Sequence, residues 1–363
     1  MRVLLAPDSF KGSATAREVA AALRDGWLSE RPSDDVVLAP MADGGEGTLD
    51  AFAAAVPGAR RVPAEVDGPD GRRVRCGWLL LPDGTGVVEL AAASGLPLMD
   101  RPDAFAAHTL GFGQAIAAAL DRDVDRLLLA LGGSASTDGG TGLLSALGAR
   151  FLDRVGRPVP LGNAGLTVLD RIDLTGLRPL PEEGATVLGD VDAPLLGPSG
   201  AAAVFGPQKG ALPADVPVLE AGLERLAGLA GGDPTAPGTG AAGGAGFGLR
   251  LWGATIAAGA AAVGEAVDLP RLVREADLVV TGEGRYDEQS ATGKAPSYVR
   301  SLARQSGTPV LLVAGSITTG TEGFAATAGL VDVAGGLPAA LADPARWLRR
   351  AAGDLARRYP AVP

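Results

Sequence analysis

Acidic and basic side chains in this chain gather in short polar turns that follow apolar runs. Asp8, Ser9 and Lys11 lie in one such turn, and Asp43 and Glu46 lie in the next. Carboxylates beside lysines and glycines can orient a hydroxyl group or take up its proton, as phosphoryl transfer requires. The same residue types also serve as caps, turn residues and surface ion pairs. A chemical role therefore requires these turns to converge in the folded chain.

A glycine-rich turn between two apolar segments is a candidate anion-binding loop. Leu127–Leu131 has the composition of a buried strand, and the apolar residues after Gly140 recur at helical spacing. A strand, such a turn and a helix start would place backbone N–H groups around an anion. The alternative is an ordinary strand-to-helix connection in which Asp138 caps the helix. The candidate residues are Gly132, Gly133, Ser134, Thr137 and Asp138, together with Lys209 from a separate glycine-flanked loop.

Two further polar clusters follow strand-like runs. They are Asp190 and Asp192 after Thr186–Gly189, and Glu283, Arg285 and Asp287 after Leu278–Thr281. If the strand before Asp190 continues, Asp190 and Asp192 point to the same face, and such a pair suits a hard cation such as Mg²⁺. The alternative is that both aspartates organise the turn before Pro194 through local backbone hydrogen bonds.

Strand–turn–helix units occur at both ends of the chain and predict a parallel sheet. Val3–Ala6 is an expected strand, and Thr15 with Glu18 forms a capping box that opens a helix. The pattern repeats over residues 36–56 and returns after residue 275. The expected elements near the C-terminus are the strands Val310–Ala314 and Leu330–Ala334 and the helix Pro344–Arg357.

The middle of the chain has a different texture, with short alternating strands separated by Asp-Gly turns at Asp67–Gly71 and Pro82–Gly84. We therefore predict an α/β protein of two domains. Residues 1–60 and 275–363 would share one flavodoxin-like parallel sheet, and residues 61–274 would form an inserted mixed α/β domain. Because open α/β sheets bind ligands at the carboxyl ends of their strands, we expect the active site in a cleft between the two domains.

Composition excludes several classes of function. The 363 residues carry a formal charge of -10, which argues against nucleic-acid and anionic-membrane partners. Cys76 and His108 are the only cysteine and histidine, so a disulfide framework or a zinc site of Cys or His pairs within one chain is excluded. No signal peptide or spanning segment is expected, which predicts a cytoplasmic protein. The G-x-G-x-x-G match at 238–243 follows a proline-rich loop instead of a strand, so we reject it as a dinucleotide fingerprint.

Six blocks of sequence, in this order, resemble the bacterial glycerate kinase family of the glycerate 2-kinase type. They are APDSFKGS (6–13), PMADGGEGT (40–48), ALGGSASTDGGTG (130–142), VFGPQKGA (204–211), GAAGGAG (240–246) and LVVTGEGRYDEQSATGKAP (278–296). The blocks span nearly the whole chain and are specific as a set. Thr137 and Ala193 depart from the asparagines common in the family, and the GRYDEQS segment differs in detail from the family's usual form.

The resemblance implies ATP-dependent phosphorylation of D-glycerate, with the 2-hydroxyl as the expected position and Mg²⁺ as the metal. The polar clusters above then place Asp190 and Lys11 at the reacting centre and Gly132–Gly140 with Lys209 on the ATP phosphates. Asp190 is expected either to hold Mg²⁺ with Asp192 or to accept the glycerate hydroxyl proton. The glycerate side comprises Asp8, Ser9, Asp43, Glu46, Glu283, Arg285 and Asp287. The alternatives are a small-acid binding or sensor protein, a kinase for another small hydroxy acid, and a dehydrogenase. Oligomeric state is not predicted.

Overall fold

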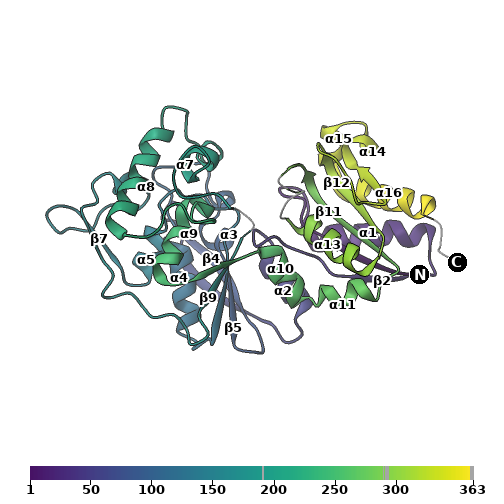
Figure 1. Ribbon diagram of the computed structural model, residues 1–363, viewed down its shortest axis with the longest axis horizontal. Coiled ribbons are helices and arrows are strands. Elements are labelled where there is room, and N and C mark those ends of the chain that lie inside the picture. Colours follow the sequence, from purple (N-terminus) through teal and green to yellow (C-terminus); the bar gives the residue numbers. More distant parts are fainter. Residues whose placement is uncertain (190–191, 289, 291–293, 360–363) are drawn as a thin grey trace. The chain divides into compact units, whose positions relative to one another are not determined.

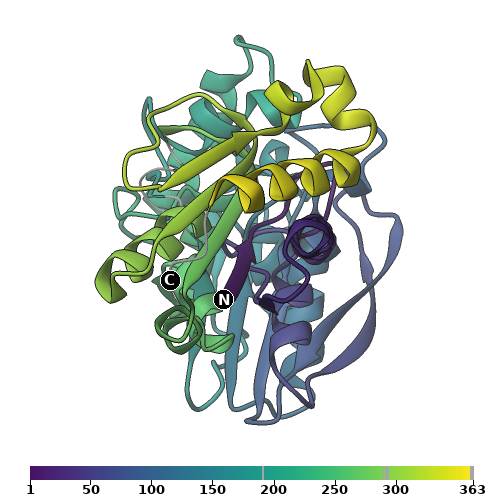
Figure 2. The same cartoon turned by 90° about the vertical axis from the view of Figure 1, so that its right-hand side faces the viewer.

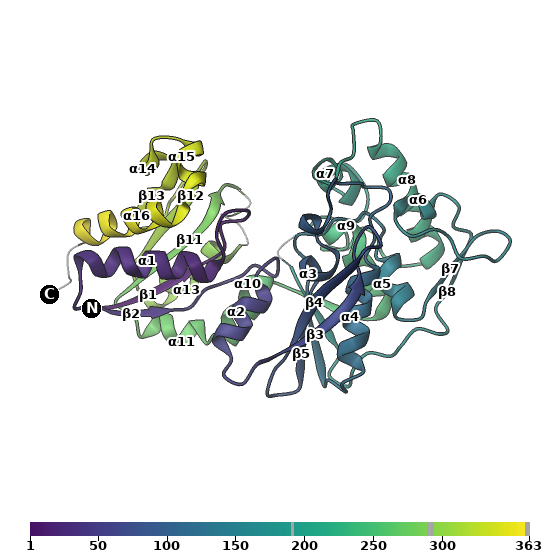
Figure 3. The same cartoon turned by 180° about the vertical axis from the view of Figure 1, so that it is seen from behind.

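The structure is a computed structural model that describes residues 1–189, 192–288, 290 and 294–359. It divides into two compact units. Unit 1 comprises residues 1–43, 50–56 and 258–363, and unit 2 comprises residues 44–49 and 57–257. Figures 1 and 3 show the two units from opposite sides. The sequence prediction placed the domain boundaries between residues 60 and 61 and between residues 274 and 275. Within the described residues no helix has the length and apolar character needed to cross a membrane.

Unit 1 is built on a five-stranded parallel sheet in the order β13-β12-β11-β1-β2. The strands are β1 (Arg2–Pro7), β2 (Asp35–Leu38), β11 (Leu278–Tyr286), β12 (Val310–Ile317) and β13 (Ala326–Gly329). Numbered within this sheet along the chain, the order is 2-1-3-4-5, which is the flavodoxin order. The predicted flavodoxin-like sheet from both ends of the chain is therefore confirmed.

Helices cover this sheet. They are α1 (Ala16–Glu30), α10 (Gly259–Ala266), α11 (Leu269–Arg274), α13 (Ala295–Ser306), α14 (Leu330–Ala334), α15 (Leu337–Ala342) and α16 (Pro344–Arg358), with α2 (Thr48–Ala55) beginning in unit 2. The predicted capping box of α1 is present, since Thr15 accepts the Glu18 N–H while Glu18 accepts the Thr15 N–H. Figure 2 looks onto unit 1 and shows α16 (yellow) packed beside α1 (purple), where Trp27 and Leu348 are buried together.

Two elements of unit 1 differ from the sequence prediction. The segment Leu330–Ala334 is helix α14 and not a strand, because the strand before it ends at Gly329 and its apolar run is too short to distinguish the two states. Strand β11 also runs five residues beyond Thr281, to Tyr286, and pairs with β12 along this extension. Glu283 and Arg285 therefore lie in a strand and not in a turn.

Unit 2 contains a six-stranded mixed sheet in the order β10-β9-β6-β5-β4-β3 and a separate β7-β8 pair. The strands are β3 (Arg60–Asp67), β4 (Arg73–Leu80), β5 (Thr85–Glu89), β6 (Arg126–Ala130), β7 (Arg150–Leu152), β8 (Arg171–Asp173), β9 (Ala185–Leu188) and β10 (Thr255–Ala257). The predicted antiparallel pairing of β3 with β4 and of β4 with β5 is confirmed, while β5, β6, β9 and β10 run parallel. The glycine-rich turn follows β6, as predicted.

The helices of unit 2 enclose an apolar core rich in leucine, valine and alanine around Trp78, Phe112 and Phe247. They are α3 (Leu90–Ser94), α4 (Leu110–Leu120), α5 (Thr141–Ala146), α6 (Asn163–Leu166), α7 (Ala201–Phe205), α8 (Val216–Ala230) and α9 (Ala241–Trp252), with short 3₁₀ turns at Leu96–Leu98 and Pro207–Lys209. The rejected fingerprint at 238–243 lies at the start of α9. There Ala242, Gly243 and Gly244 have left-handed φ angles of 54°, 66° and 91°, and no strand precedes them.

Candidate active site

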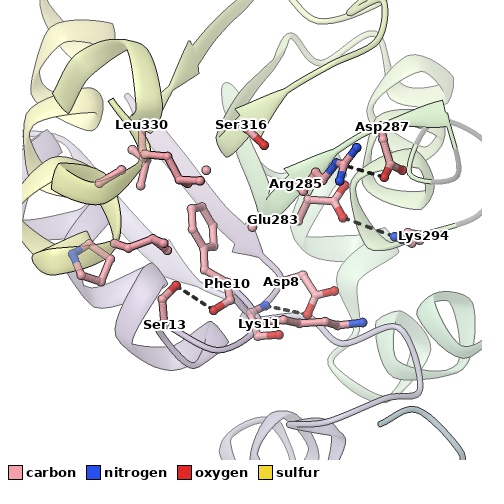
Figure 4. A pocket seen from close by; sticks show the side chains of 17 residues that line it. Asp8, Phe10, Lys11, Ser13, Glu283, Arg285, Asp287, Lys294, Ser316 and Leu330 are labelled. Atoms are coloured by element: carbon pink, nitrogen blue, oxygen red, sulfur yellow. Dashed lines mark hydrogen bonds and ion pairs between the residues drawn. The ribbon is translucent and has the colours of Figure 1, made fainter. Parts of the chain in front are cut away.

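A pocket of about 290 Å³ lies in unit 1 at the carboxyl ends of β1, β11 and β12. Strands β1 and β11 are neighbours at the point where the strand order reverses, and ligands of open α/β sheets bind at that position. Figure 4 shows the polar side chains gathered on one side of the pocket and Phe10 and Leu330 on the other. The pocket therefore has a charged end and an apolar end.

Asp8 begins the loop after β1 and lies at the charged end, where its exposed fraction is 3%. Its Oδ1 accepts the backbone N–H of Ser9 at 2.6 Å. Burial and the neighbouring carboxylate of Asp43 raise the pKa of Asp8 well above its ordinary value, against the lowering effect of Lys11. Asp8 is thus a carboxyl group that holds its proton more strongly than a solvated aspartate does.

Lys11 brings a cation to the same end. Its Nζ lies 3.2 Å from Oδ2 of Asp43, and its side chain is 58% exposed. Burial of part of the side chain lowers the pKa of Lys11, but Asp43 and Asp8 outweigh that effect and raise it. Lys11 is therefore charged at neutral pH and open to a ligand, so it can pair with a substrate carboxylate.

Glu283 projects from β11 and is almost wholly buried, with an exposed fraction of 6%. Its Oε2 lies 3.9 Å from the Nζ of Lys294, the residue that precedes helix α13. Its Oε1 is buried without a hydrogen-bond partner among the described residues. Burial raises the pKa of Glu283 to about 7. Glu283 is therefore a group that can change its protonation state near neutral pH.

Arg285 and Asp287 complete the charged end. Arg285 Nε lies 3.5 Å from Asp287 Oδ2, and the arginine side chain is 68% exposed. Asp287 Oδ1 accepts the N–H of Ser290 at 3.2 Å, which fixes the carboxylate at the end of β11. The structure therefore brings together Asp8, Ser9, Lys11, Asp43, Glu283, Arg285 and Asp287 of the predicted glycerate residues, all within unit 1.

Glu46 lies with a different set of residues. It is exposed and belongs to the segment Gly44–Leu49, which is part of unit 2. That segment packs on the glycine-rich turn, since Gly132 donates its N–H to the Gly44 carbonyl and a Cβ on Gly132 would lie 2.3 Å from the Gly45 Cα. Two of the sequence blocks thus meet through glycines that allow close backbone contact.

Lys209 lies beneath the glycine-rich turn of unit 2 and is buried, with an exposed fraction of 1%. Its Nζ donates to Ser134 Oγ at 2.8 Å and to the Ser136 carbonyl at 2.5 Å. Burial lowers the pKa of Lys209 to about 7. A Cβ on Gly243 would lie 2.8 Å from the Nζ, so the left-handed start of α9 closes over the lysine. The ammonium group contacts the turn itself.

Thr137 and Asp138 also direct their side chains into the protein. Thr137 donates its hydroxyl to the Ala104 carbonyl. Asp138 accepts the N–H and the hydroxyl of Thr109 at 2.9 and 2.8 Å and the N–H groups of Gly140 and Gly142 at 3.1 Å each. These bonds fix the turn before α5, although the N-cap of that helix is Gly140 and not Asp138. The N–H groups of Gly132, Ala135, Gly139 and Gly140 are also used within unit 2, by the Gly44, Ser94 and Gly243 carbonyls and by Asp138. An anion would bind the remaining backbone amides of the turn.

The expected metal ligands are only partly described. Asp190 lies outside the described residues, and Asp192 is exposed after β9. Among the described residues, no three His, Cys, Asp or Glu side chains gather as metal ligands. Kinases commonly hold Mg²⁺ with one or two carboxylates plus phosphate oxygens and waters, so an aspartate pair would fit the ion by residue type.

Several residues of the pocket were not among the predicted site residues. Lys294 and Ser316 line its charged side, and its apolar end comprises Phe10, Leu330, Leu337, Ala340, Leu341 and Pro344. Leu337 and Leu341 are 55% and 57% exposed, which is unusual for leucines. For Ser316 a signal existed, because Gly315-Ser316 directly follows the predicted strand Val310–Ala314. The leucines of α15 gave no such signal in the sequence, because their position depends on how α14, α15 and α16 pack together.

The fold and the pocket define a two-unit α/β protein with a partly charged pocket at the switch point of its flavodoxin-like sheet. The sequence matches the model of the glycerate kinase family over residues 3–360. It is 41% identical to the glycerate kinase of Bacillus subtilis (strain 168), covering 98% of this chain and 97% of that protein. It is 40% identical to the glycerate 2-kinase of Escherichia coli (strain K12), covering 88% and 86%.

A solved structure agrees with the sequence relatives. The putative glycerate kinase 2 of Salmonella typhimurium LT2 superimposes with a TM-score of 0.81 at 38% identity, covering 99% of this chain and 98% of that one. The chain belongs to the glycerate kinase family. It is accordingly an enzyme, a kinase whose acceptor is an alcohol group.

Proposed function

We propose that this protein transfers the γ-phosphoryl group of ATP to the 2-hydroxyl of D-glycerate. Family membership supports a glycerate kinase, and the name of the Escherichia coli relative supports the 2-position. The observation that carries the proposal is the charged end of the pocket in unit 1, where Lys11, Lys294 and Arg285 lie around the carboxyl groups of Asp8 and Glu283. A hydroxy acid needs both a cation for its carboxylate and an acceptor for its hydroxyl.

We assign glycerate to this pocket. Lys11 is the proposed partner of the glycerate carboxylate, because it is the lysine with the more exposed side chain of the two that line the pocket. Asp43 holds Lys11 and Asp287 holds Arg285, while Asp8 lies beside them in the pocket. Ser9 offers a hydroxyl whose oxygen is buried without a partner among the described residues. The predicted role of Glu46 on the glycerate side has less support, since Glu46 lies with unit 2.

We assign the ATP phosphates to the turn Gly132–Gly140 in unit 2, through the backbone N–H groups that the turn does not use internally. The turn contains Gly133, whose left-handed φ of 77° favours glycine. The inward bonds of Ser134, Thr137 and Asp138 support a backbone site over a side-chain site. In this proposal Lys209 acts by holding Ser134 and the Ser136 carbonyl, which fixes the shape of the turn.

We propose Mg²⁺ as the metal, held by Asp192 with Asp190. The ion would neutralise charge on the transferring phosphoryl group. Because ATP is the proposed donor, we also propose the cytoplasm as the place of action. The alternative is a kinase for another small hydroxy acid.

The decisive experiment incubates the purified protein with ATP, Mg²⁺ and D-glycerate. We expect glycerate-dependent formation of ADP, and a phosphorus NMR spectrum coupled to the C2 proton of the product. Phosphate on C3 would contradict the position, and turnover only with other hydroxy acids would contradict the substrate. Tight binding of glycerate by folded protein without ADP formation would favour a binding protein instead.

A further inference from the structure

Among the carboxyl groups that line the pocket, Glu283 has a buried oxygen without a hydrogen-bond partner in the described part of the chain. The polar atoms of buried side chains normally have hydrogen-bond partners, because an unpaired one costs free energy. Oε1 of Glu283 has none among the described residues, although Oε2 lies 3.9 Å from the Lys294 ammonium group. The carboxyl group lines the pocket at the switch point, and Figure 4 places it between Asp8 and Lys294. An unpaired acceptor at that position is ready for a donor on the ligand.

The rigidity of β11 fits a role in chemistry. Glu283 is opposite Ala314 of β12 in the parallel register, and the next residues continue the strand to Tyr286. Sites on strands position groups more precisely than sites on loops. Gly282 and Gly284 flank the glutamate. A Cβ on Gly282 would lie 2.0 Å from the Val313 carbonyl oxygen, and a Cβ on Gly284 would lie 3.2 Å from the Phe10 Cα. The close packing of these glycines leaves Glu283 little freedom to move.

We propose that Glu283 is the catalytic residue that removes the proton from the glycerate hydroxyl during phosphoryl transfer. The glycerate O–H bond breaks and its proton binds Oε1. The oxygen forms a bond to the γ-phosphorus of ATP, and the bond from that phosphorus to the β–γ bridging oxygen breaks, releasing ADP. The proton then passes from Glu283 to water after the product leaves. This inference rests on the proposed kinase function, and it names the group that performs one step of it.

The electrostatic surroundings suit a base. The charged and titratable groups that face Glu283 are Lys294 at the start of α13, Asp287 and Tyr286 at the end of β11, and Asp8, Lys11 and Asp43 from the loops after β1 and β2. Burial above all, with the carboxylates of Asp43 and Asp287, favours the protonated form of Glu283, while the Ser290 hydroxyl and Lys294 favour the ionised form. Their balance puts the pKa of Glu283 at about 7, which matches a base operating at neutral pH.

Asp8 is less suited to the same task. Its Oδ1 already accepts the Ser9 N–H, and its pKa is raised well above the ordinary value with Asp43 beside it. A base must also be ionised before it can act. Glu283 has the unoccupied oxygen and a cation beside the other oxygen, so it combines access with a sizeable ionised fraction near pH 7.

The test uses Glu283→Gln, which keeps size and shape but cannot take the proton. We expect kcat to fall by roughly 10²- to 10⁴-fold with KM for glycerate changed by only a few-fold. In the wild type, kcat/KM should fall tenfold per pH unit below about 7, because protonated Glu283 is inactive. The variant should lack that limb. Glu65→Gln changes a 61% exposed glutamate on β3 and should match the wild type.

Other variants keep the inference falsifiable. If Glu283→Gln does not fold, Glu283→Asp retains the carboxylate and should show a reduced kcat with the acid limb still present. NMR of ¹³C-labelled glutamate carboxyls, assigned with the variant, should show Glu283 titrating near pH 7. A folded Glu283→Gln enzyme with wild-type kcat, or with the acid limb intact, would overturn the inference while leaving the kinase standing. No ADP formation by the wild type would instead overturn the proposed function.

Discussion

Two buried ionisable residues, Lys209 and Glu283, have pKa values moved toward neutrality in opposite directions. Burial lowers the pKa of Lys209 and raises that of Glu283, each to about 7, because burial disfavours whichever form is charged. Their surroundings differ. Lys209 contacts two acceptors within its own unit, while Glu283 lines a pocket with one oxygen unpaired. The lysine therefore stabilises a turn, and the glutamate is available to a ligand.

The buried Lys209 should give the protein a measurable dependence of stability on pH. Its folded pKa of about 7 lies below the ordinary 10.5, so between these values the unfolded chain binds a proton that the folded chain does not. The unfolding free energy therefore rises with pH in that window. We expect the wild type to gain stability relative to Lys209→Met as pH rises from 7 to 10, by at most about 1.4 kcal/mol per pH unit.

Urea denaturation across that pH range measures the difference. Lys11→Met is the control, because the pKa of Lys11 is raised and both of its states stay protonated there. The difference in unfolding free energy between the wild type and Lys11→Met should stay constant over this pH range. If the difference in unfolding free energy between the wild type and Lys209→Met also stays constant with pH, the folded protein keeps this ammonium group charged at neutral pH.

At the scale of residues, the sequence shows which polar residues follow each apolar run, but it does not show where their side chains point. The sequence picks out Asp8, Lys11, Glu283 and Asp138 as polar residues after apolar runs. It cannot show that Asp138 accepts two hydrogen bonds from its own turn and two from Thr109, while one oxygen of Glu283 has no partner among the described residues. The direction of a side chain depends on packing from elements distant in sequence, such as Thr109 for Asp138.

At the scale of elements, one glycine sets how closely α1 approaches α16. A Cβ on Gly26 would lie 2.1 Å from the Arg349 carbonyl oxygen, a distance that real contacts do not reach. Glycine inside a helix ordinarily lowers stability by about 1 kcal/mol relative to alanine. Glycine fits at position 26 despite its low helix propensity, because α1 and α16 pack too closely there for a Cβ atom.

We expect Gly26→Ala to destabilise the protein by roughly 1–3 kcal/mol, since overpacking outweighs the better helix propensity of alanine. Gly228→Ala in α8 is the matched control, because a Cβ there would meet nothing within 4 Å. That change should be neutral or stabilising by up to about 1 kcal/mol. Equal effects of the two substitutions in a denaturant titration would refute the packing argument.

The elements themselves followed the sequence wherever the signal was local. The capping box of Thr15 and Glu18 correctly opened α1, and Pro344 correctly opened α16. The errors arose where the deciding contact was distant. Leu330–Ala334 gave the same apolar pattern as a strand, and the extension of β11 through Arg285 depends on its pairing with Ser316 of β12.

At the scale of the whole molecule, the chain changes unit several times between residues 43 and 57 before it returns at residue 258. The flavodoxin order followed from strand–turn–helix units at both ends of the chain, and the mixed middle followed from its hairpin turns. The division of one polar block was not predictable. Asp43 pairs with Lys11 in unit 1, while Gly44–Leu49 belongs to unit 2 and contacts Gly132.

The assignment of glycerate to unit 1 and of ATP to unit 2 predicts that a substitution can weaken the binding of one ligand without affecting the binding of the other. A ligand that binds only the folded state raises the melting temperature, and at a fixed ligand concentration the stabilisation grows with the logarithm of its affinity. Lys11→Ala removes the proposed partner of the glycerate carboxylate, whose side chain is 58% exposed, so folding should be little affected. Gly133→Val adds a branched side chain at a φ of 77°, where the turn must approach the phosphates.

We therefore expect Lys11→Ala to reduce the thermal shift caused by D-glycerate at least threefold and to leave the shift caused by Mg-ATP unchanged. Gly133→Val should do the reverse, after correction for its own lower melting temperature. Differential scanning fluorimetry with each ligand alone gives the four values, and Glu65→Gln, exposed on β3, provides the baseline. If Lys11→Ala lost the ATP shift, or Gly133→Val lost the glycerate shift, the assignment of ligands to units would have to be exchanged.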